Sequence, residues 1–362
     1  MKNINKNIII IGNLDGYANS VRPVEIKNFL EKQGHKISIL DTHHLGRSSA
    51  LGSWKYLHYF IQTIITLENL LLSNLDKYFY FYFLIIDMKI RAFLVTKIII
   101  KGNYDIVICE NSLHTLITTK NIPCYIILDL PAPIAEELYY SNKLSLNLYN
   151  KLNNLFKVIY KNADKVTFHW NIYNNYIKQN NYNGENIFEL NWGCKPQPFI
   201  NRAKYNIRPK IIFLGYLAGQ WVNLPLLSKL SKLYPIDVYG GPPPDKKWGL
   251  NYKGYAPSTG VLKDYQFGLI SISKDKLRKS SFSSKHLEYL SFGLPVLTPD
   301  WRKDTALEDV SIFYNENNFL TVLKKYSEKK LWDEISERSF KKAKGWEWEK
   351  VLNPLCNIIN NV

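Results

Sequence analysis

Short apolar runs alternate with longer segments of helical periodicity along the first half of the chain. Residues 8–11 are four consecutive isoleucines, the pattern of a parallel strand that is buried on both faces. A turn-rich loop and a helical segment at residues 21–33 follow, and Gly34 is placed to end that helix. Further strands are expected at residues 36–40, 104–109, 124–128, 165–169 and 188–190. This alternation predicts a parallel sheet with right-handed crossovers.

The same pattern restarts after a proline-containing segment. Residues 195–209 hold three prolines and have weak periodicity, which indicates a linker between domains. Beyond it, strands are expected at residues 210–214, 236–239, 252–255, 267–272, 295–298 and 312–314, with helices at residues 224–233 and 284–292. The chain is therefore predicted to be an α/β protein with two Rossmann-like, doubly wound parallel-sheet domains facing a cleft.

The position of the ligands follows from this architecture. In an open parallel sheet the binding crevice lies at the carboxyl ends of the strands. Two such sheets that face each other form one deep cleft with a site on each wall. That arrangement suits a transfer reaction between two substrates from which water must be excluded.

Charge and cysteine content narrow the range of partners. Lys and Arg number 47 against 31 Asp and Glu, a net charge of +16, which favours an anionic membrane, a phosphorylated substrate or a nucleic acid. No recognised nucleic-acid-binding module is visible, so we expect no nucleic acid partner. The four cysteines form no CxxC pair, and the N-terminus lacks the layout of a signal peptide. We therefore expect a cytoplasmic protein with reduced thiols.

The segment at residues 56–100 is the most apolar and aromatic part of the chain. Charged residues interrupt it, and no uncharged run reaches the roughly 18 residues that a membrane span requires. We expect one or two amphipathic helices. The aromatic run at residues 78–83, with lysines nearby, suits contact with the inner face of an anionic membrane. The alternative is a pair of helices packed on the first sheet.

A phosphate-binding helix is predicted from residues 283–296. Ser283, Ser284 and Lys285 stand at its start, where unsatisfied N–H groups and a positive dipole end favour an anion. Glu288 lies one turn later on the same face and can accept both ribose hydroxyls of a nucleotide. Gly293 is placed to end this helix before the next buried strand.

The pattern Lys-x-x-Glu-Tyr-Leu-x-x-Gly-Leu-Pro-Val at residues 285–296 resembles the donor-site helix of GT-B glycosyltransferases, particularly the GT4-like group. The resemblance extends to residues 213–215, 252–254 and 346–348, and so over most of the chain. It implies an acceptor domain at residues 1–197, a donor domain at residues 205–342, and a C-terminal helix at residues 343–362 that crosses back to the first domain.

The resemblance also implies an activity and a donor site. A metal-independent enzyme of the hexosyltransferase type is expected, with a nucleotide-diphosphate sugar as co-substrate and no other cofactor. By the same resemblance Glu288 holds the donor ribose, and Lys285 with Ser283 or Ser284 faces the diphosphate. Gly215 and Tyr216, directly after the first strand of the donor domain, belong to the same site. No HExxH, DxD-type or P-loop motif is present.

Two departures from that group bear on the mechanism. The glutamate that usually stands eight positions before Glu288 is replaced by Ser280, and the loop at residues 216–221 has no cation. Both favour an inverting enzyme, which needs a general base. Asp129, after a buried strand, is the first candidate for that base, and Asp15 is the second. A turn or capping aspartate is the alternative for Asp129.

Other residues of the first domain are candidates for the acceptor site. Gly16, Arg22 and His169 are expected to contact the acceptor or a phosphate, although a surface role for Arg22 and a structural role for His169 stay open. The expected acceptor is a lipid-linked or polysaccharide intermediate of cell-surface glycan synthesis. Two alternatives remain: a GT-B-fold hexosamine epimerase, and a noncatalytic protein that binds a nucleotide sugar or a glycan.

Overall fold

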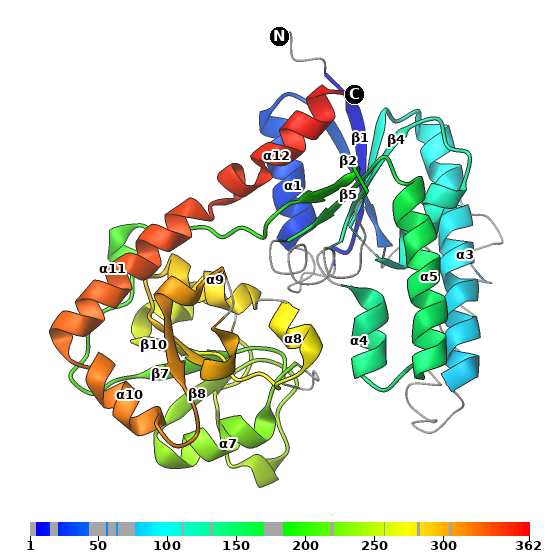
Figure 1. Ribbon diagram of the computed structural model, residues 1–362. Helices are drawn as coiled ribbons and strands as arrows, with labels where there is room; N and C mark the ends of the chain where they lie inside the picture. The colour runs from blue at the N-terminus through cyan, green and yellow to red at the C-terminus, as the bar shows by residue number, and fades with distance from the viewer. Residues whose placement is uncertain are drawn as a thin grey trace. The chain divides into compact units, whose positions relative to one another are not determined.

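A computed structural model describes residues 5–14, 21–42, 56, 63, 77–110, 112–130, 133–169, 184–217, 221–256, 258–280, 283–303 and 306–362 (Figure 1). The chain forms two compact units. The first unit is Met1–Asn191 together with Leu352–Val362, and the second unit is Trp192–Val351. The chain therefore passes between the units twice, once after Asn191 and once after Val351.

The first unit is built on a six-stranded parallel sheet. Its strands are β1 (Asn7–Gly12), β2 (Lys36–Asp41), β3 (Ile106–Cys109), β4 (Tyr125–Asp129), β5 (Lys165–Phe168) and β6 (Ile187–Glu189). Their order is β2-β1-β3-β4-β5-β6. The chain leaves β1 toward β2 on one side and continues with β3 on the other. The topological switch point, where such sheets bind ligands, therefore lies between β1 and β3.

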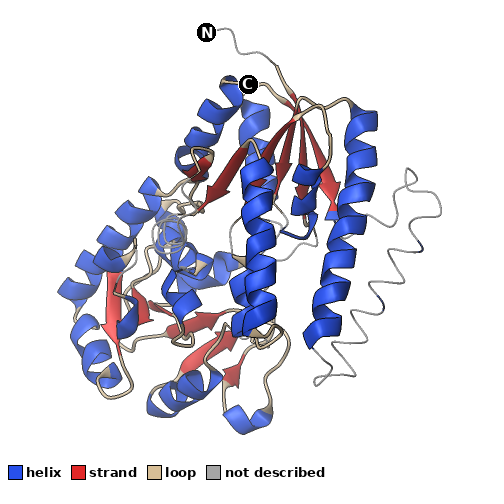
Figure 2. Ribbon diagram, turned by 45° about the vertical axis from the view of Figure 1, so that its right-hand side comes forward, coloured by secondary structure: helices blue, strands red, loops and turns tan. Residues whose placement is uncertain are grey.

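Helices cover both faces of this sheet (Figure 2). They are α1 (Val21–Lys32), α3 (Lys77–Gly102), α4 (Ile134–Tyr140) and α5 (Leu146–Asn162), with the 3-10 segment η4 (Ser112–Thr119). Gly34, just after α1, has a φ of +91°, a left-handed conformation that glycine adopts without strain and that ends the helix. Ser145 caps α5 by accepting a hydrogen bond from the Leu148 amide.

Helix α3 accounts for the second half of the aromatic segment. Leu84, Met88 and Val95 join the hydrophobic core of the sheet, and Asp87 forms a buried ion pair with Arg91 at 2.7 Å. Its opposite face exposes large apolar side chains: Tyr78, Phe79, Tyr82 and Ile86. Of residues 56–76 only Tyr56 and Thr63 are described. Among the described helices, none has the length and apolar character needed to cross a membrane.

The second unit is also built on a six-stranded parallel sheet. Its strands are β7 (Ile211–Leu214), β8 (Ile236–Tyr239), β9 (Asn251–Tyr252), β10 (Phe267–Leu269), β11 (Val296–Pro299) and β12 (Ser311–Tyr314). The order is β12-β11-β10-β7-β8-β9, which puts the switch point between β7 and β10. The predicted α/β class with two Rossmann-like parallel sheets is confirmed.

Two strands of the second unit end earlier than predicted. β9 ends at Tyr252, and Gly254, with a φ of +92°, follows it while its carbonyl still accepts a hydrogen bond from the Gly240 amide. β10 stops at Leu269, three residues before the predicted end at Ile272. There the chain leaves the parallel ladder, and Ile272 instead forms an antiparallel bridge with Val222.

The helices of the second unit are α7 (Leu224–Leu233), α8 (Lys276–Ser280), α9 (Ser284–Ser291), α10 (Phe319–Tyr326) and α11 (Lys329–Gly345). Short 3-10 segments connect them: η6 (Phe199–Asn201), η7 (Lys246–Trp248), η8 (Thr259–Asp264), η9 (Asp300–Arg302) and η10 (Glu308–Val310). Helix α7 has the predicted bounds, and Asn223 caps it through the Leu226 amide. The last helix, α12 (Trp348–Asn360), begins in the second unit and belongs to the first from Leu352 onward.

Candidate functional site

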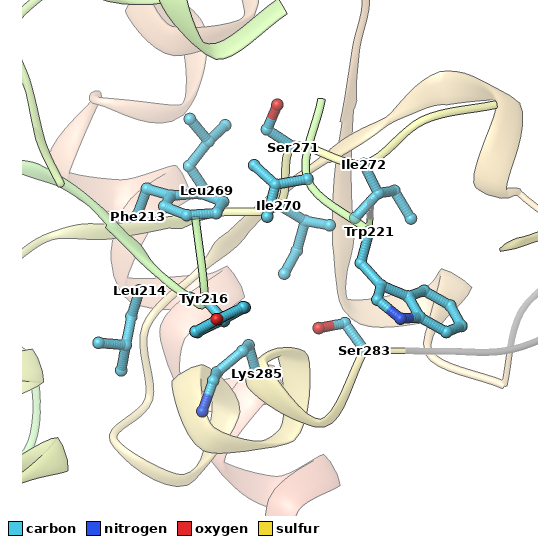
Figure 3. A pocket seen from close by; sticks show the side chains of 12 residues that line it. Phe213, Leu214, Tyr216, Trp221, Leu269, Ile270, Ser271, Ile272, Ser283 and Lys285 are labelled. Carbon is cyan, nitrogen blue, oxygen red and sulfur yellow. The ribbon is translucent and has the colours of Figure 1, made fainter. Parts of the chain in front are cut away.

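A pocket lies at the switch point of the second sheet, where the chain leaves β7 and β10 (Figure 3). Its lining comes from the end of β7 and the chain after it, the end of β10 and the chain after it, and the start of α9: Phe213, Leu214, Gly215, Tyr216, Trp221, Val222, Leu269, Ile270, Ser271, Ile272, Ser283 and Lys285. Four of the six residues predicted for the donor site, namely Ser283, Lys285, Gly215 and Tyr216, are thus brought together.

A buried tyrosine fixes α9 against these strand ends. Tyr289 is fully buried, and its hydroxyl accepts a hydrogen bond from the Leu214 amide at 2.8 Å. Gly268 lies under the ring, since a Cβ at that position would be 2.4 Å from Tyr289 Cγ. A larger residue at Gly268 would push the helix away. The first turn of α9 is therefore held at the carboxyl ends of β7 and β10.

The start of α9 presents polar groups to the pocket. Ser283 is the N-cap residue, but its side chain makes no capping hydrogen bond. Lys285 Nζ lies 3.0 Å and 3.1 Å from the two carboxylate oxygens of Glu288. Both side chains of this pair are about one-quarter exposed. Ser284 is the first helical residue and is not part of the lining.

An arginine from α8 contacts one residue of the pocket wall. The guanidinium carbon of Arg278 is 3.0 Å from the ring centroid of Trp221, which lines the pocket. Arg278 is buried, and its Nε lies 3.6 Å from Asp275 Oδ2. The sequence predicted no cation for the loop that Trp221 ends. The fold supplies one from α8, because Arg278 is 57 positions from Trp221 and nothing in the loop indicates it.

Two further basic side chains interact electrostatically here: Arg302 with Arg278, and His286 of α9 with Arg302. Burial, and then the charge of Arg278, lower the pKa of Arg302 to about 10. Burial, and then the charge of Arg302, lower the pKa of His286 to about 3. His286 is therefore neutral at neutral pH, while Arg302 stays charged. The resulting positive potential around α9 suits a phosphate ligand.

The first unit carries a buried ion pair at the carboxyl edge of its sheet. Arg22 of α1 contacts both oxygens of Asp129, with Nε to Oδ2 at 2.6 Å and Nη2 to Oδ1 at 2.8 Å. Thr167 Oγ1 donates a further hydrogen bond to Asp129 Oδ1 at 2.6 Å. Both members of the ion pair are almost completely buried.

The same guanidinium also anchors the end of the sheet. Arg22 Nη1 donates to the Asn191 carbonyl at 2.8 Å, and Nη2 donates to the Leu190 carbonyl at 3.2 Å. Burial lowers the pKa of Arg22, but Asp129 and Glu110 raise it more, so it lies above its ordinary value. The predicted residues Arg22 and Asp129 are thus brought together as a clamp between α1, β4 and the chain after β6. This geometry does not favour Asp129 as a free general base.

A second carboxyl group lies at the switch point of the first sheet. Glu110 directly follows β3, and its amide donates to the Ile11 carbonyl of β1 at 2.9 Å. A Cβ built on Gly12 would lie 3.6 Å from Glu110 Oε2. Burial raises the pKa of Glu110 well above its ordinary value, Asp129 raises it further, and Arg22 opposes both. Glu110 was missed by the sequence analysis, although its place directly after a strand was a usable signal.

The remaining predicted residues of the first unit are distributed as follows. His169 comes directly after β5 and is buried at the same edge of the sheet. Asp15 and Gly16 lie outside the described residues.

No protein-family model matches this sequence, and no curated protein matches it. Solved structures do match. The sucrose-phosphate synthase from Thermosynechococcus elongatus is 9% identical, with a TM-score of 0.70 over 99% of both chains. The α,α-trehalose 6-phosphate synthase from Burkholderia multivorans is 8% identical, with a TM-score of 0.64 over 99% of both chains. CalG4, the calicheamicin glycosyltransferase, is 8% identical, with a TM-score of 0.55 over 98% of both chains. The chain therefore has the two-domain fold of GT-B glycosyltransferases, as its sequence resemblance implied.

Proposed function

We propose that this protein is a glycosyltransferase that moves a sugar from a nucleotide-diphosphate sugar to an acceptor hydroxyl. The observation that carries the proposal is the pocket at the β7–β10 switch point, with Ser283 and Lys285 of α9 in its lining. Solved structures that share the fold bear the names of sugar-phosphate synthases and a glycosyltransferase, which supports the same reaction class.

The chemistry of the pocket fits a diphosphate flanked by a sugar and a nucleoside. The start of α9, which no side chain caps, offers backbone N–H groups to an anion, and Lys285 adds a full charge. Arg278, in contact with Trp221, adds positive potential. Glu288 is assigned to the ribose hydroxyls. Its contact with Lys285 is partly exposed, so exchanging that partner for a ligand costs little.

The proposed acceptor is a lipid-linked or polysaccharide intermediate of cell-surface glycan synthesis. The exposed face of α3, formed by Tyr78, Phe79, Tyr82 and Ile86, supports this assignment. Lys89 and Lys97 of the same helix are also exposed, and the chain carries a net charge of +16. Aromatic rings beside lysines suit the headgroup region of an anionic membrane. We therefore propose a peripheral position at the inner face of the membrane.

A donor screen tests the reaction. UDP-, GDP-, TDP- and ADP-sugars are each added to the protein, and the shift in Tm and the release of nucleoside diphosphate are measured. One donor class is expected to raise Tm and to release its diphosphate when an acceptor extract is present. Binding without release under any condition would indicate a noncatalytic binding protein. Release of a free sugar with altered configuration at C2 would indicate an epimerase.

Vesicle sedimentation tests the membrane assignment. The protein is expected to pellet with anionic vesicles at low salt and to be released at high salt. Tyr82→Ser combined with Phe79→Ser should reduce the bound fraction, whereas the same changes at Tyr255 and Phe199, which are exposed in the second unit, serve as the control. Equal absence from anionic and neutral vesicles at low salt would contradict the assignment.

A further inference from the structure

The pocket at the β7–β10 switch point is smaller than the donor that is assigned to it. It encloses about 160 Å³, whereas sites that surround a drug-sized ligand hold roughly 300–1,000 Å³. A nucleotide-diphosphate sugar consists of a sugar, a diphosphate, a ribose and a base, so part of it lies outside the pocket. That part meets the lining residues that are open to solvent.

Tyr216 is a lining residue of this kind, because it is 67% exposed. The other two aromatic side chains of the lining are less accessible: Phe213 is buried, and Trp221 is half-buried. Arg278 lies over the Trp221 ring, with its guanidinium carbon 3.0 Å from the ring centroid, and so covers one face of the indole. Of the three rings, that of Tyr216 is therefore best placed to offer its face to a planar group of a ligand.

The end of β8 fixes the backbone that carries Tyr216. The Gly215 amide donates a hydrogen bond to the Tyr239 carbonyl at 3.0 Å. The Gly215 carbonyl packs so closely on Gly240 that a Cβ at Gly240 would overlap it. The Tyr252 hydroxyl donates to the Gly240 carbonyl at 2.6 Å, which holds this glycine in place. The ring at Tyr216 thus stands on an ordered backbone, and little of that backbone has to be reorganised when a ligand binds.

The contacts of Lys285 indicate which end of the donor lies toward Tyr216. Lys285 Nζ contacts both carboxylate oxygens of Glu288, which is the residue assigned to the ribose. Figure 3 shows Lys285 and the Tyr216 ring on one side of the pocket. Ser283 and the Trp221 indole are on the other side. The ribose therefore lies on the side of Tyr216, and so does the base, because the base is attached to the ribose.

We propose that the base of the donor stacks on the ring of Tyr216. The inference rests on the proposed transfer from a nucleotide-diphosphate sugar and adds the residue that binds its base. Stacking on an aromatic ring depends little on the identity of the base, since every base has a π-face. Tyr216 therefore contributes affinity for nucleoside diphosphates in general and does not select among them.

The test compares ligands that have a base with one that lacks it. UDP, GDP, TDP, ADP and ribose 5′-diphosphate are titrated into the wild type, Tyr216→Ala, Tyr216→Phe and Tyr255→Ala, and calorimetry measures Kd. Tyr255 is the matched control, because it is 64% exposed in the same unit and is not part of the pocket lining. Since Tyr216 is mostly exposed, Tyr216→Ala should keep the Tm of the wild type when no ligand is present.

Tyr216→Ala is expected to raise the Kd of each nucleoside diphosphate that the wild type binds by about 5–100-fold, because a stacking ring is lost. Its Kd for ribose 5′-diphosphate should stay within about threefold of the wild-type value, because that ligand has no base to stack. Tyr216→Phe keeps the ring and should bind both kinds of ligand as the wild type does. Tyr255→Ala should also match the wild type.

The outcomes separate this inference from the proposed function. An equal loss of affinity for both kinds of ligand in Tyr216→Ala would show a contact with the ribose or the diphosphate and would overturn the inference. A loss in Tyr255→Ala instead would place the base on another ring and overturn it as well. If the wild type and Tyr216→Ala bind nucleoside diphosphates equally well, only the inference fails. If the wild type binds no nucleoside diphosphate, the proposed function fails, and the inference fails with it.

Discussion

The two switch points share a topology and differ in chemistry. In the second unit, β7 and β10 open onto a pocket with hydroxyls and a lysine in its lining, and an arginine contacts its wall. In the first unit, β1 and β3 open beside a carboxyl group with a raised pKa, next to a buried ion pair. The order of parallel strands decides where a ligand can bind, whereas the side chains at the strand ends decide which chemistry is available there.

The ion pairs at the two switch points differ in how far they are exposed to water. Lys285 and Glu288 are about one-quarter exposed, so a ligand can replace either partner without leaving a charge buried alone. Arg22 and Asp129 are almost fully buried, and loss of one leaves the other uncompensated. The Lys285–Glu288 pair is therefore suited to binding a ligand, and the Arg22–Asp129 pair to holding the fold.

The largest expected effect comes from breaking the buried pair. Asp129→Asn should lower the free energy of unfolding by about 3–5 kcal/mol, because Arg22 would stay buried with its charge unbalanced. Urea denaturation measures the change. The control is Asp333→Asn, which breaks the exposed pair with Lys329 and should cost no more than about 1 kcal/mol. Similar losses in both variants would remove the distinction between the two kinds of pair.

Glu288→Gln addresses the exposed pair of the second unit. The fold should be unchanged, and the affinity for the nucleotide sugar should fall by about 1.5–3 kcal/mol, because a charged hydrogen bond to the ribose is lost. Titration calorimetry with the donor found in the screen measures this loss. A 2′,3′-dideoxy nucleotide should bind both proteins equally well. Unchanged donor affinity in the folded variant would disprove the assignment of Glu288.

Arg278→Gln tests the cation that the fold brings to Trp221. Donor affinity should fall about tenfold, or about 1.4 kcal/mol, while the affinity for the free nucleoside stays the same. Arg202→Gln is a matched control, because Arg202 also lies over an aromatic ring, 3.2 Å from the centroid of Phe340, and Phe340, unlike Trp221, is not part of the pocket lining. Equal effects of the two variants would show that Arg278 only stabilises the second unit.

The smallest expected effect is a difference in the pH response of the two units. The lowered pKa of His286 means that the unfolded chain takes up a proton between pH 6.5 and about 3 that the folded chain does not. Stability is therefore lost as the pH falls through this window. The raised pKa of Glu110 in the first unit has the opposite effect, because its stabilisation is lost as the pH rises. His286→Gln should flatten the decrease of Tm between pH 7 and pH 4. If Tm decreases equally in the wild type and the variant, His286 is not the source of the loss of stability in acid.

Local patterns were sufficient to predict most of the fold. The four isoleucines of β1 and the bounds of α7 followed from runs and periodicity within a few residues. The motif of α9 likewise indicated a helix, because its N-cap residue, its charges and its terminal glycine are all local. The pocket position then followed from topology alone.

The first unit shows what local patterns leave out. Arg22 and Asp129 are 107 positions apart, and nothing near either residue indicates that they form a bidentate pair. The place of Asp129 at the end of a buried strand favoured a catalytic base. The raised pKa of Glu110 depends on burial by segments distant in sequence. Arg278 approaches Trp221 only because β10 and α8 return the chain to the end of β7.

The route of α12 has a consequence for the order in which the protein is made. Its residues Leu352, Leu355 and Ile359 are completely buried, and they belong to the first unit. During synthesis, the whole second unit leaves the ribosome before these side chains do. A nascent chain of 191 residues therefore has the first sheet but not its full core. The first unit reaches its final packing last, although it is synthesised first, and any stop codon before residue 352 leaves it incomplete.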